Sequence, residues 1–302
     1  MKIPPYLQKG DTIGITCPAG YMAYEKITMC IETLQQWGFA VKEGKTINSQ
    51  SKNYFSGTDE ERLNDLQEMM DDDAIKAILC GRGGYGCGRI IDKLSFKKIR
   101  KHPKWIIGFS DITILHAHLF SNYKIVSLHA PMAGAFNDGG YKNASVLSLK
   151  QALSGKPYRY NIKASRYNRP GKAEGKLVGG NLSLLAHITG TPSDIKTKGN
   201  ILFIEDIGEY SYGIDRMLHQ LKRSGKFNQL AGLIVGGFTD MKDTERPFGK
   251  TIPAIISDII KEYDFPVCFD FPVSHGKENY TLKVGVQHQL HVTAKNVVLK
   301  EI

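Results

Sequence analysis

The segment Ala74-Ile-Lys-Ala-Ile-Leu-Cys80-Gly-Arg-Gly-Gly-Tyr-Gly86 shows how this chain is built. Its first seven residues form an apolar run of strand length, the next six form a glycine-rich loop, and a predicted helix follows over 88–93. The order of strand, loop and helix repeats in the next part of the chain, where the apolar run 105–108 is followed by a tight turn and a predicted helix over 112–120. Strands that alternate with helices predict a parallel sheet, which binds ligands in the loops at the carboxyl ends of its strands.

The alternation continues on both sides of this segment. Toward the N-terminus we predict strands over 11–17 and 39–42, and helices over 24–37 and 59–70. Beyond residue 177 we predict helices over 181–188, 214–222 and 253–263, strands over 200–204, 230–238 and 266–269, and an antiparallel tail over 281–299. The fold class is therefore α/β, with a partly antiparallel portion near the C-terminus.

A polar, basic stretch with glycine and proline but no clear period separates the two halves. It predicts a domain boundary. We expect an N-terminal domain over 1–155 with a parallel sheet of the Rossmann or flavodoxin type, and a linker over 156–176. A C-terminal α/β domain with a mixed sheet would then cover 177–302.

The composition excludes several classes of protein. The chain has 302 residues and is 41% hydrophobic, which is too apolar for a disordered chain, and no apolar run is long enough for a membrane span. The N-terminus lacks the apolar core of an export signal, and the five cysteines lack metal-ligand spacing, so we expect reduced thiols, a cytoplasmic location and no metal or cofactor. The net charge of +10 comes from scattered lysines, which indicates a basic surface rather than a nucleic-acid or membrane partner.

Ser110 is the candidate nucleophile. It follows the apolar run 105–108 and precedes a helix, in the sequence Gly108-Phe-Ser110-Asp-Ile. A tight turn at this place lifts a hydroxyl off the sheet, and the N–H of Asp111 can stabilise an oxyanion. The alternative is that Ser110 or Asp111 only caps the next helix.

The glycine loop 81–86 is a candidate anion site. Closely spaced glycines let backbone N–H groups approach an anion without interference from Cβ atoms. The spacing does not match a dinucleotide or phosphate-binding fingerprint. The loop instead fits a second oxyanion donor, with Arg82 available for a carboxylate, while a turn without a ligand remains the alternative.

An acid and a histidine complete a possible triad. Glu205, Asp206 and Glu209 follow the apolar strand predicted over 200–204, and any of them could orient a histidine. Among nine histidines, His275 stands out because it lies in a polar loop followed by glycine. The order serine, acid, histidine along the chain is that of α/β-hydrolase triads.

These motifs together resemble one family. Arg82-Gly-Gly-Tyr-Gly86, Lys104 to Thr113, Gly179-Gly-Asn-Leu182, Phe203-Ile-Glu-Asp206 and Gly236-Gly-Phe-Thr239 are similar in order and spacing to the LD-carboxypeptidases. These proteins are also called muramoyltetrapeptide carboxypeptidases and include the microcin-C immunity peptidases.

The resemblance implies a cytoplasmic, metal-independent serine peptidase, commonly a homodimer. It implies Ser110 as nucleophile, Glu205 as the orienting acid and His275 as general base, with backbone oxyanion donors at Gly84 and Asp111. One position departs from the family pattern, because the usual Gly-His pair is Ser274-His275 here.

The implied reaction releases the C-terminal D-alanine of a murein tetrapeptide. Such an enzyme must also bind the free carboxylate of its substrate, and Arg82 and Arg216 are the candidates because guanidinium pairs with carboxylate in bidentate geometry. Two other functions stay open: an immunity peptidase that cleaves a peptide–nucleotide toxin, and a non-catalytic anion-binding module.

Overall fold

The computed structural model describes residues 1–302, which divide into two compact units. The first unit contains Met1–Lys156 and a short returning segment, Tyr280–Lys283. The second contains Pro157–Asn279 and Val284–Ile302. None of the helices combines the length and the apolar character that crossing a bilayer requires.

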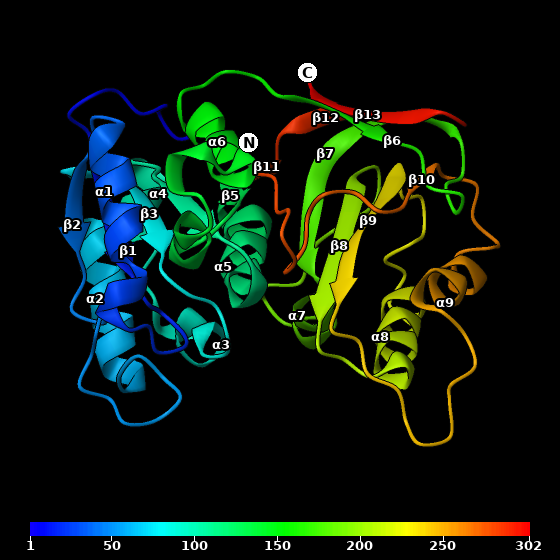
Figure 1. The fold of residues 1–302 in the computed structure, drawn as a ribbon, viewed down its shortest axis with the longest axis horizontal. Coiled ribbons are helices and arrows are strands. Elements are labelled where there is room, and N and C mark those ends of the chain that lie inside the picture. The colour runs from blue at the N-terminus through cyan, green and yellow to red at the C-terminus, as the bar shows by residue number, and fades with distance from the viewer. The chain divides into compact units, whose positions relative to one another are not determined.

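The first unit is built on one six-stranded sheet (Figure 1), with the strand order β11-β5-β4-β3-β1-β2. Neighbouring strands from β2 to β5 all pair in parallel. The strands are β1 (Thr12–Thr16), β2 (Ala40–Glu43), β3 (Ile75–Cys80), β4 (Trp105–Gly108), β5 (Ser127–His129) and β11 (Leu282–Val284). The helices are α1 (Thr28–Gln36), α2 (Asp59–Asp71), α3 (Cys87–Ile90), α4 (Lys97–Lys101), α5 (Thr113–His118) and α6 (Ala144–Leu153).

Local sequence explains the start of α2. The Thr58 hydroxyl accepts a hydrogen bond from the Glu61 N–H at 3.2 Å, and the Glu61 carboxylate accepts one from the Thr58 N–H at 2.7 Å. This reciprocal pair satisfies two donors that a helix start leaves unpaired. The residues Thr58 to Glu61 therefore fix where α2 begins.

The second unit is built on a seven-stranded mixed sheet, with the strand order β10-β9-β8-β7-β12-β13-β6. The strands are β6 (Arg159–Lys163), β7 (Gly171–Asn181), β8 (Ile201–Ile207), β9 (Gly232–Thr239), β10 (Val267–Cys268), β12 (Gln287–Val292) and β13 (Asn296–Glu301). The helices are α7 (Leu182–His187), α8 (Ser211–Arg223) and α9 (Ile252–Ile259). Strands β7 to β10 pair in parallel, whereas β6, β12 and β13 pair antiparallel, so the predicted α/β fold class with its mixed portion is confirmed.

The stretch 156–176, predicted to be a linker, instead forms β6 and the first half of β7. Residues 171–176 of β7 pair antiparallel with β12, and residues 177–181 pair in parallel with β8. Local sequence could not show this, because the partners β12 and β13 lie more than a hundred residues away. Residues of β6 also alternate between exposed and half-buried, which leaves no apolar period.

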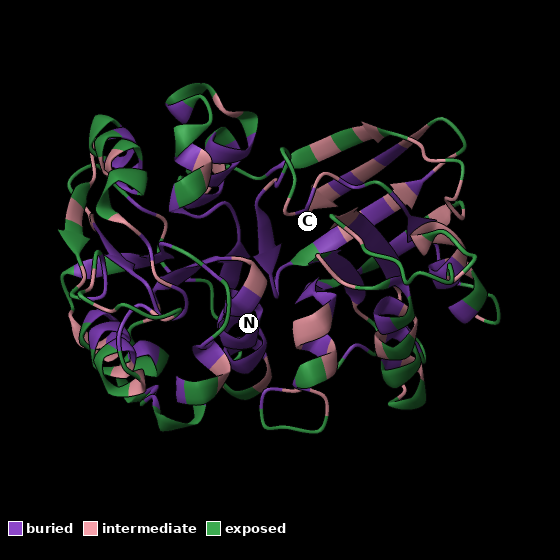
Figure 2. Ribbon diagram, turned by 60° about the horizontal axis from the view of Figure 1, so that its bottom comes forward, coloured by how far each residue is buried: buried purple, intermediate pink, exposed green.

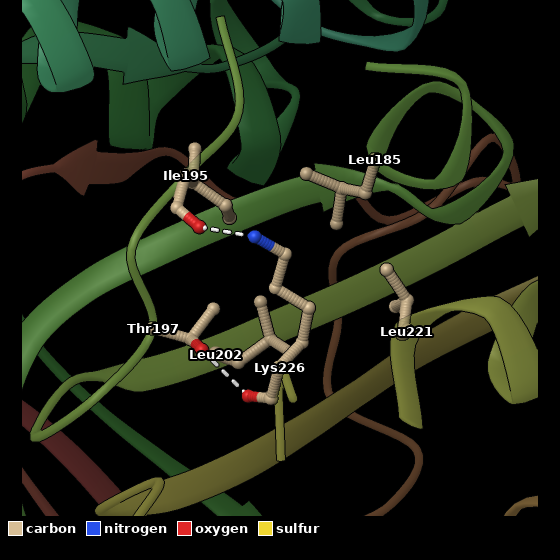
Figure 3. Close-up of a pocket in the computed structure, with 6 residues that line it drawn as sticks. All are labelled: Leu185, Ile195, Thr197, Leu202, Leu221 and Lys226. Atoms are coloured by element: carbon tan, nitrogen blue, oxygen red, sulfur yellow. Dashed lines mark hydrogen bonds between the residues drawn. The ribbon is translucent and has the colours of Figure 1, made fainter. Parts of the chain in front are cut away.

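The central strands of each sheet form the buried core of their unit. Figure 2 shows that the central strands are buried and that the helices expose one side. A small cavity of about 10 Å³ lies among Leu185, Leu202, Leu221 and the buried Lys226 (Figure 3). The Lys226 ammonium donates to the Ile195 carbonyl at 2.8 Å. Because this volume holds one water at most, the cavity cannot take a substrate.

Candidate active site

Ser110 lies on a strained turn at the carboxyl end of β4. Its φ of 61° is in the left-handed region, which residues other than glycine rarely adopt. A Cβ added at Gly108, where φ is 157°, would lie 2.8 Å from Cγ1 of Ile112. The turn therefore requires glycine at 108 and holds a half-buried serine in an unfavourable conformation, as a nucleophile elbow does.

The glycine loop lies directly against Ser110. It follows β3, the neighbour of β4 in the sheet, and the carboxyl ends of parallel neighbours lie at the same edge. A Cβ added at Gly83 would be 2.9 Å from the Ser110 Cβ and 3.1 Å from its Oγ. The sequence did not separate Gly83 from the other glycines of the loop, yet it is the one that makes this approach possible.

The Gly83–Gly84 peptide has a defined orientation. The Gly83 carbonyl accepts a hydrogen bond from the Gly20 N–H at 3.0 Å. Because a trans peptide places its C=O and N–H on opposite sides, the Gly84 N–H points away from Gly20. The positive φ of Gly84, 99°, also favours glycine at this position.

The Asp111 side chain connects the nucleophile turn with the glycine loop. It is fully buried, and its Oδ2 accepts a hydrogen bond from the Cys87 N–H at 2.7 Å. Cys87 is the first residue after the loop. The Asp111 carboxylate thus has a structural task, separate from the oxyanion role predicted for its backbone N–H.

His116 is hydrogen-bonded to the start of the Ser110 turn. It is fully buried on α5, and its Nε2 lies 2.8 Å from the carbonyl oxygen of Gly108. Burial lowers the pKa of His116 to about 4, so the ring is neutral and Nε2–H donates to this carbonyl. His116 therefore packs in the core of the first unit and adds a hydrogen bond to the start of the Ser110 turn.

In the second unit, Glu205 and His275 form a close pair. Glu205 lies near the carboxyl end of β8 and is fully buried, and its Oε2 is 2.6 Å from Nδ1 of His275. A carboxylate only accepts, so Nδ1 carries a proton, and in the neutral form of the ring the lone pair lies on Nε2. The His275 side chain is 12% exposed, so the pair combines a fully buried acid with a half-buried imidazole.

Two glycines of β9 make room for the loop that carries His275. A Cβ added at Gly236 would lie 2.2 Å from the Val273 carbonyl oxygen, and one at Gly237 would lie 2.5 Å from the Ser274 Cβ. The Gly237 N–H also donates to the Val273 carbonyl at 2.9 Å. These two glycines oppose the single residue Glu205, which is a β-bulge in the β8–β9 ladder.

The other two acids considered for this role point elsewhere. Asp206 accepts hydrogen bonds from the Asn181 side chain at 2.8 Å and from the Ser183 N–H at 2.9 Å, at the start of α7. Burial raises its pKa to about 6. Glu209 is half-buried and lies beyond the end of the strand. Of the three acids, only Glu205 contacts His275.

Both candidate carboxylate-binding arginines are exposed. The Arg82 Nη1 donates to the Tyr21 carbonyl at 2.6 Å, which holds its side chain beside the glycine loop of the first unit. The Arg216 guanidinium lies 5.2 Å from the ring centroid of Tyr212, one turn earlier on α8. The contacts of Arg82 therefore connect it to the loop beside Ser110, while those of Arg216 are local to its helix.

All five cysteines are buried as free thiols, and no group of three or more His, Cys, Asp or Glu side chains is arranged to hold a metal ion. Cys17 also lies close to the glycine loop, because a Cβ added at Gly81 would be 2.8 Å from its Sγ. Burial, with Asp65 nearby, raises the pKa of Cys17 to about 12, so its thiol is protonated at neutral pH.

Hydrolases on α/β folds use a serine on a strained turn beside backbone N–H groups, and a histidine paired with a buried acid. The chain has residues of both kinds. The comparisons with known proteins narrow this class. The model of the LD-carboxypeptidase N-terminal domain matches residues 13–130, and the model of the C-terminal domain matches residues 174–290. The chain belongs to the LD-carboxypeptidase family and is therefore a peptidase.

Individual relatives agree with this assignment. The chain is 39% identical to a probable murein peptide carboxypeptidase of Bacillus subtilis, over 98% of this chain and 94% of that protein. It is 27% identical to the microcin C7 self-immunity protein MccF of Escherichia coli, over 98% and 94% of the two chains. The crystal structure of muramoyltetrapeptide carboxypeptidase from Oxalobacter formigenes superimposes with a TM-score of 0.87 at 30% identity, covering 96% of this chain and 98% of that one.

The neutral, buried His116 predicts an acid-sensitive first unit. Its pKa is about 4 when folded and about 6.5 when unfolded, so the unfolded chain binds the proton first as the pH falls. This linkage removes about 3 kcal/mol of stability between pH 6.5 and pH 4. Urea unfolding followed by fluorescence tests it, because both tryptophans, Trp37 and Trp105, lie in the first unit.

His116→Gln is the matched variant, since its amide can still donate to Gly108 but does not titrate. We expect it to lose less stability than the wild type between pH 6.5 and pH 4. Equal losses in the two proteins would contradict the assignment.

The buried thiols predict resistance to thiol reagents. In the native protein at pH 8 we expect no cysteine to react rapidly with Ellman's reagent, and all five to react after denaturation, because burial excludes the reagent and raises the thiol pKa. Peptidase activity should survive the treatment. A rapidly reacting native thiol whose modification stops the activity would indicate a cysteine nucleophile instead.

Proposed function

We propose that this protein is a serine LD-carboxypeptidase that releases the C-terminal D-alanine from murein tetrapeptides. Ser110 is the nucleophile, Glu205 and His275 complete the triad, and no metal takes part. The 2.6 Å hydrogen bond between the buried Glu205 and His275 carries the proposal. It is the arrangement that fixes the tautomer of a catalytic base and stabilises its protonated form.

The mechanism uses each residue in its observed environment. His275 Nε2 takes the proton of the Ser110 hydroxyl as Oγ attacks the scissile carbonyl carbon. The tetrahedral oxyanion is bound by the N–H groups of Gly84 and Asp111, each donor being worth about 3 kcal/mol of barrier. The C–N bond then breaks, His275 returns the proton to the amine of D-alanine, and water hydrolyses the acyl-enzyme with His275 again as base.

Recognition of the substrate's free carboxylate is assigned to arginine. Arg82 is the stronger candidate, because it lies at the start of the loop whose glycine contacts Ser110. Arg216 remains the second candidate. Cytoplasmic location and homodimer formation also stay predictions of the family resemblance.

A second candidate substrate is a peptide–nucleotide toxin. The similarity to the microcin C7 self-immunity protein supports it, as does a pair of exposed aromatic side chains next to Gly84. Tyr54 and Tyr85 are each about half exposed, and a Cβ added at Gly84 would be 2.7 Å from the Tyr54 hydroxyl. Such rings can stack on a nucleobase. Both candidates use the same triad and differ only in the leaving group and the recognition of the rest of the substrate.

The decisive variant is Ser110→Ala. The wild type should release D-alanine from a murein tetrapeptide in the presence of EDTA, and Ser110→Ala should lower kcat roughly a million-fold, because the nucleophile is lost. D-Alanine is measured with a coupled D-amino-acid oxidase assay, and a fluorophosphonate probe should label only the protein that retains Ser110.

If Ser110→Ala still releases D-alanine, a mechanism with Ser110 as nucleophile is ruled out. Loss of wild-type activity with EDTA that returns with added metal would show a metal requirement. Cleavage of a peptidyl nucleotide, with no release from the tetrapeptide, would select the toxin as substrate.

Gly236→Ala tests how the His275 loop is held. The new Cβ would meet the Val273 carbonyl oxygen at 2.2 Å, so the loop must move and the Glu205–His275 hydrogen bond must lengthen. We expect kcat to fall at least ten-fold, measured by D-alanine release. The matched control is Gly213→Ala on α8, where the added Cβ would make only an ordinary contact, 3.4 Å from Glu209, and activity should be unchanged. Equal activity of the two variants would contradict this account of the loop.

A further inference from the structure

Arg62 is a buried arginine beneath the glycine loop. It lies on α2, its side chain is 0% exposed, and it is one of the largest fully buried side chains of the protein. An arginine on a helix as charged as α2 is expected to face solvent. A buried guanidinium is tolerated only where its donors are satisfied.

The guanidinium donates to three backbone carbonyls, each from a different loop, and to one carboxylate. Nη1 donates to the Pro18 carbonyl at 2.6 Å and to the Gly86 carbonyl at 3.2 Å, and Nε donates to the Gly57 carbonyl at 3.4 Å. Nη2 forms an ion pair with Asp59. The fork geometry of guanidinium, with donors in several directions, makes such a set of contacts possible.

Two of these carbonyls belong to the segments that orient the candidate oxyanion donors. Pro18 precedes Gly20, whose N–H holds the Gly83 carbonyl and thereby directs the Gly84 N–H. Gly86 is the last residue of the glycine loop itself. The Arg62 side chain therefore holds both the glycine loop and the segment around Pro18 and Gly20, to which the loop is hydrogen-bonded.

The Gly86–Cys87 peptide is held at both ends by opposite charges. Its carbonyl accepts from Arg62, and its N–H donates to the Asp111 carboxylate at 2.7 Å. A cation at the oxygen and an anion at the hydrogen fix the plane of this peptide in a low-dielectric interior. Because Asp111 directly follows Ser110, the contacts run without a break from Arg62 to the nucleophile turn.

The fit around Arg62 is close. A Cβ added at Gly86 would lie 2.6 Å from Nη1, and the guanidinium carbon lies 4.9 Å from the ring centroid of Phe55. A lysine has no planar fork and cannot reach Pro18, Gly57 and Gly86 together. Arginine is therefore required here for its shape as well as its charge.

We propose that Arg62 is a positioning residue of the oxyanion site, which holds the glycine loop so that the Gly84 N–H points to the developing charge beside Ser110. This inference rests on the proposed serine mechanism. Its action is on the transition state, since a displaced N–H weakens binding of the oxyanion but leaves binding of the ground-state substrate nearly unchanged.

The test compares Arg62→Lys with Arg89→Lys. Arg89 is the matched control, because it also pairs with Asp59 and lies over Phe55, at 5.4 Å, but it is exposed. We expect Arg62→Lys to lower kcat and the rate of Ser110 labelling by a fluorophosphonate about 30- to 100-fold, with KM within three-fold of the wild type. Arg89→Lys should stay within two-fold in all three values.

Arg62→Gln is measured in parallel because it leaves no unpaired charge in the interior and is the better tolerated change. Near-ultraviolet circular dichroism identifies the variants that are folded at the assay temperature. The inference is overturned if a folded Arg62 variant labels and turns over like Arg89→Lys, or if KM rises as much as kcat falls. If the wild-type Ser110 is not labelled and no D-alanine is released, the serine mechanism itself fails, which is a different outcome.

Discussion

Backbone atoms approach the candidate catalytic residues more closely than any side chain would permit, and the remainder of the site depends on this approach. Gly83 places the glycine loop against Ser110, and Gly236 and Gly237 let the loop that carries His275 lie on β9. Bare backbone is needed because amide N–H groups must point into a site without a Cβ in the way. The remaining features of the site hold these close contacts in place.

Buried polar groups provide that support. Asp111 holds the end of the glycine loop, His116 holds the start of the Ser110 turn, and Asp206 holds the start of α7 next to Glu205. Each lies in a low-dielectric interior, where a satisfied hydrogen bond is strong and strictly oriented. Burying such groups costs free energy of desolvation, which the core of each unit offsets. The result is a set of loops whose positions are fixed by side chains that take no part in the reaction.

The sequence alone predicted the strand–helix order, the Ser110 turn and the acid–histidine pair as a set of candidates. Residue type and spacing could not separate Glu205 from Asp206 and Glu209, a choice that only the family resemblance made, because an acid at a strand end looks the same whichever side it faces. Successive residues of a strand point to opposite faces, and only the packed sheet shows which face His275 occupies. Arg62 was missed for a related reason, since its neighbours on α2 are acidic and the stretch has the composition of a solvated helix.

Local order in the sequence determined most of the helices and strands, and which loops carry glycine, serine and histidine, because propensity, periodicity and turn chemistry act over a few residues. Only the tertiary structure decided which strands pair and which distant side chains meet. It turned the stretch 156–176 into strands, paired β7 with β12 and β8, and joined Glu205 to His275 across seventy residues. These outcomes depend on hydrogen bonds and packing between segments distant in the chain, which no local pattern records.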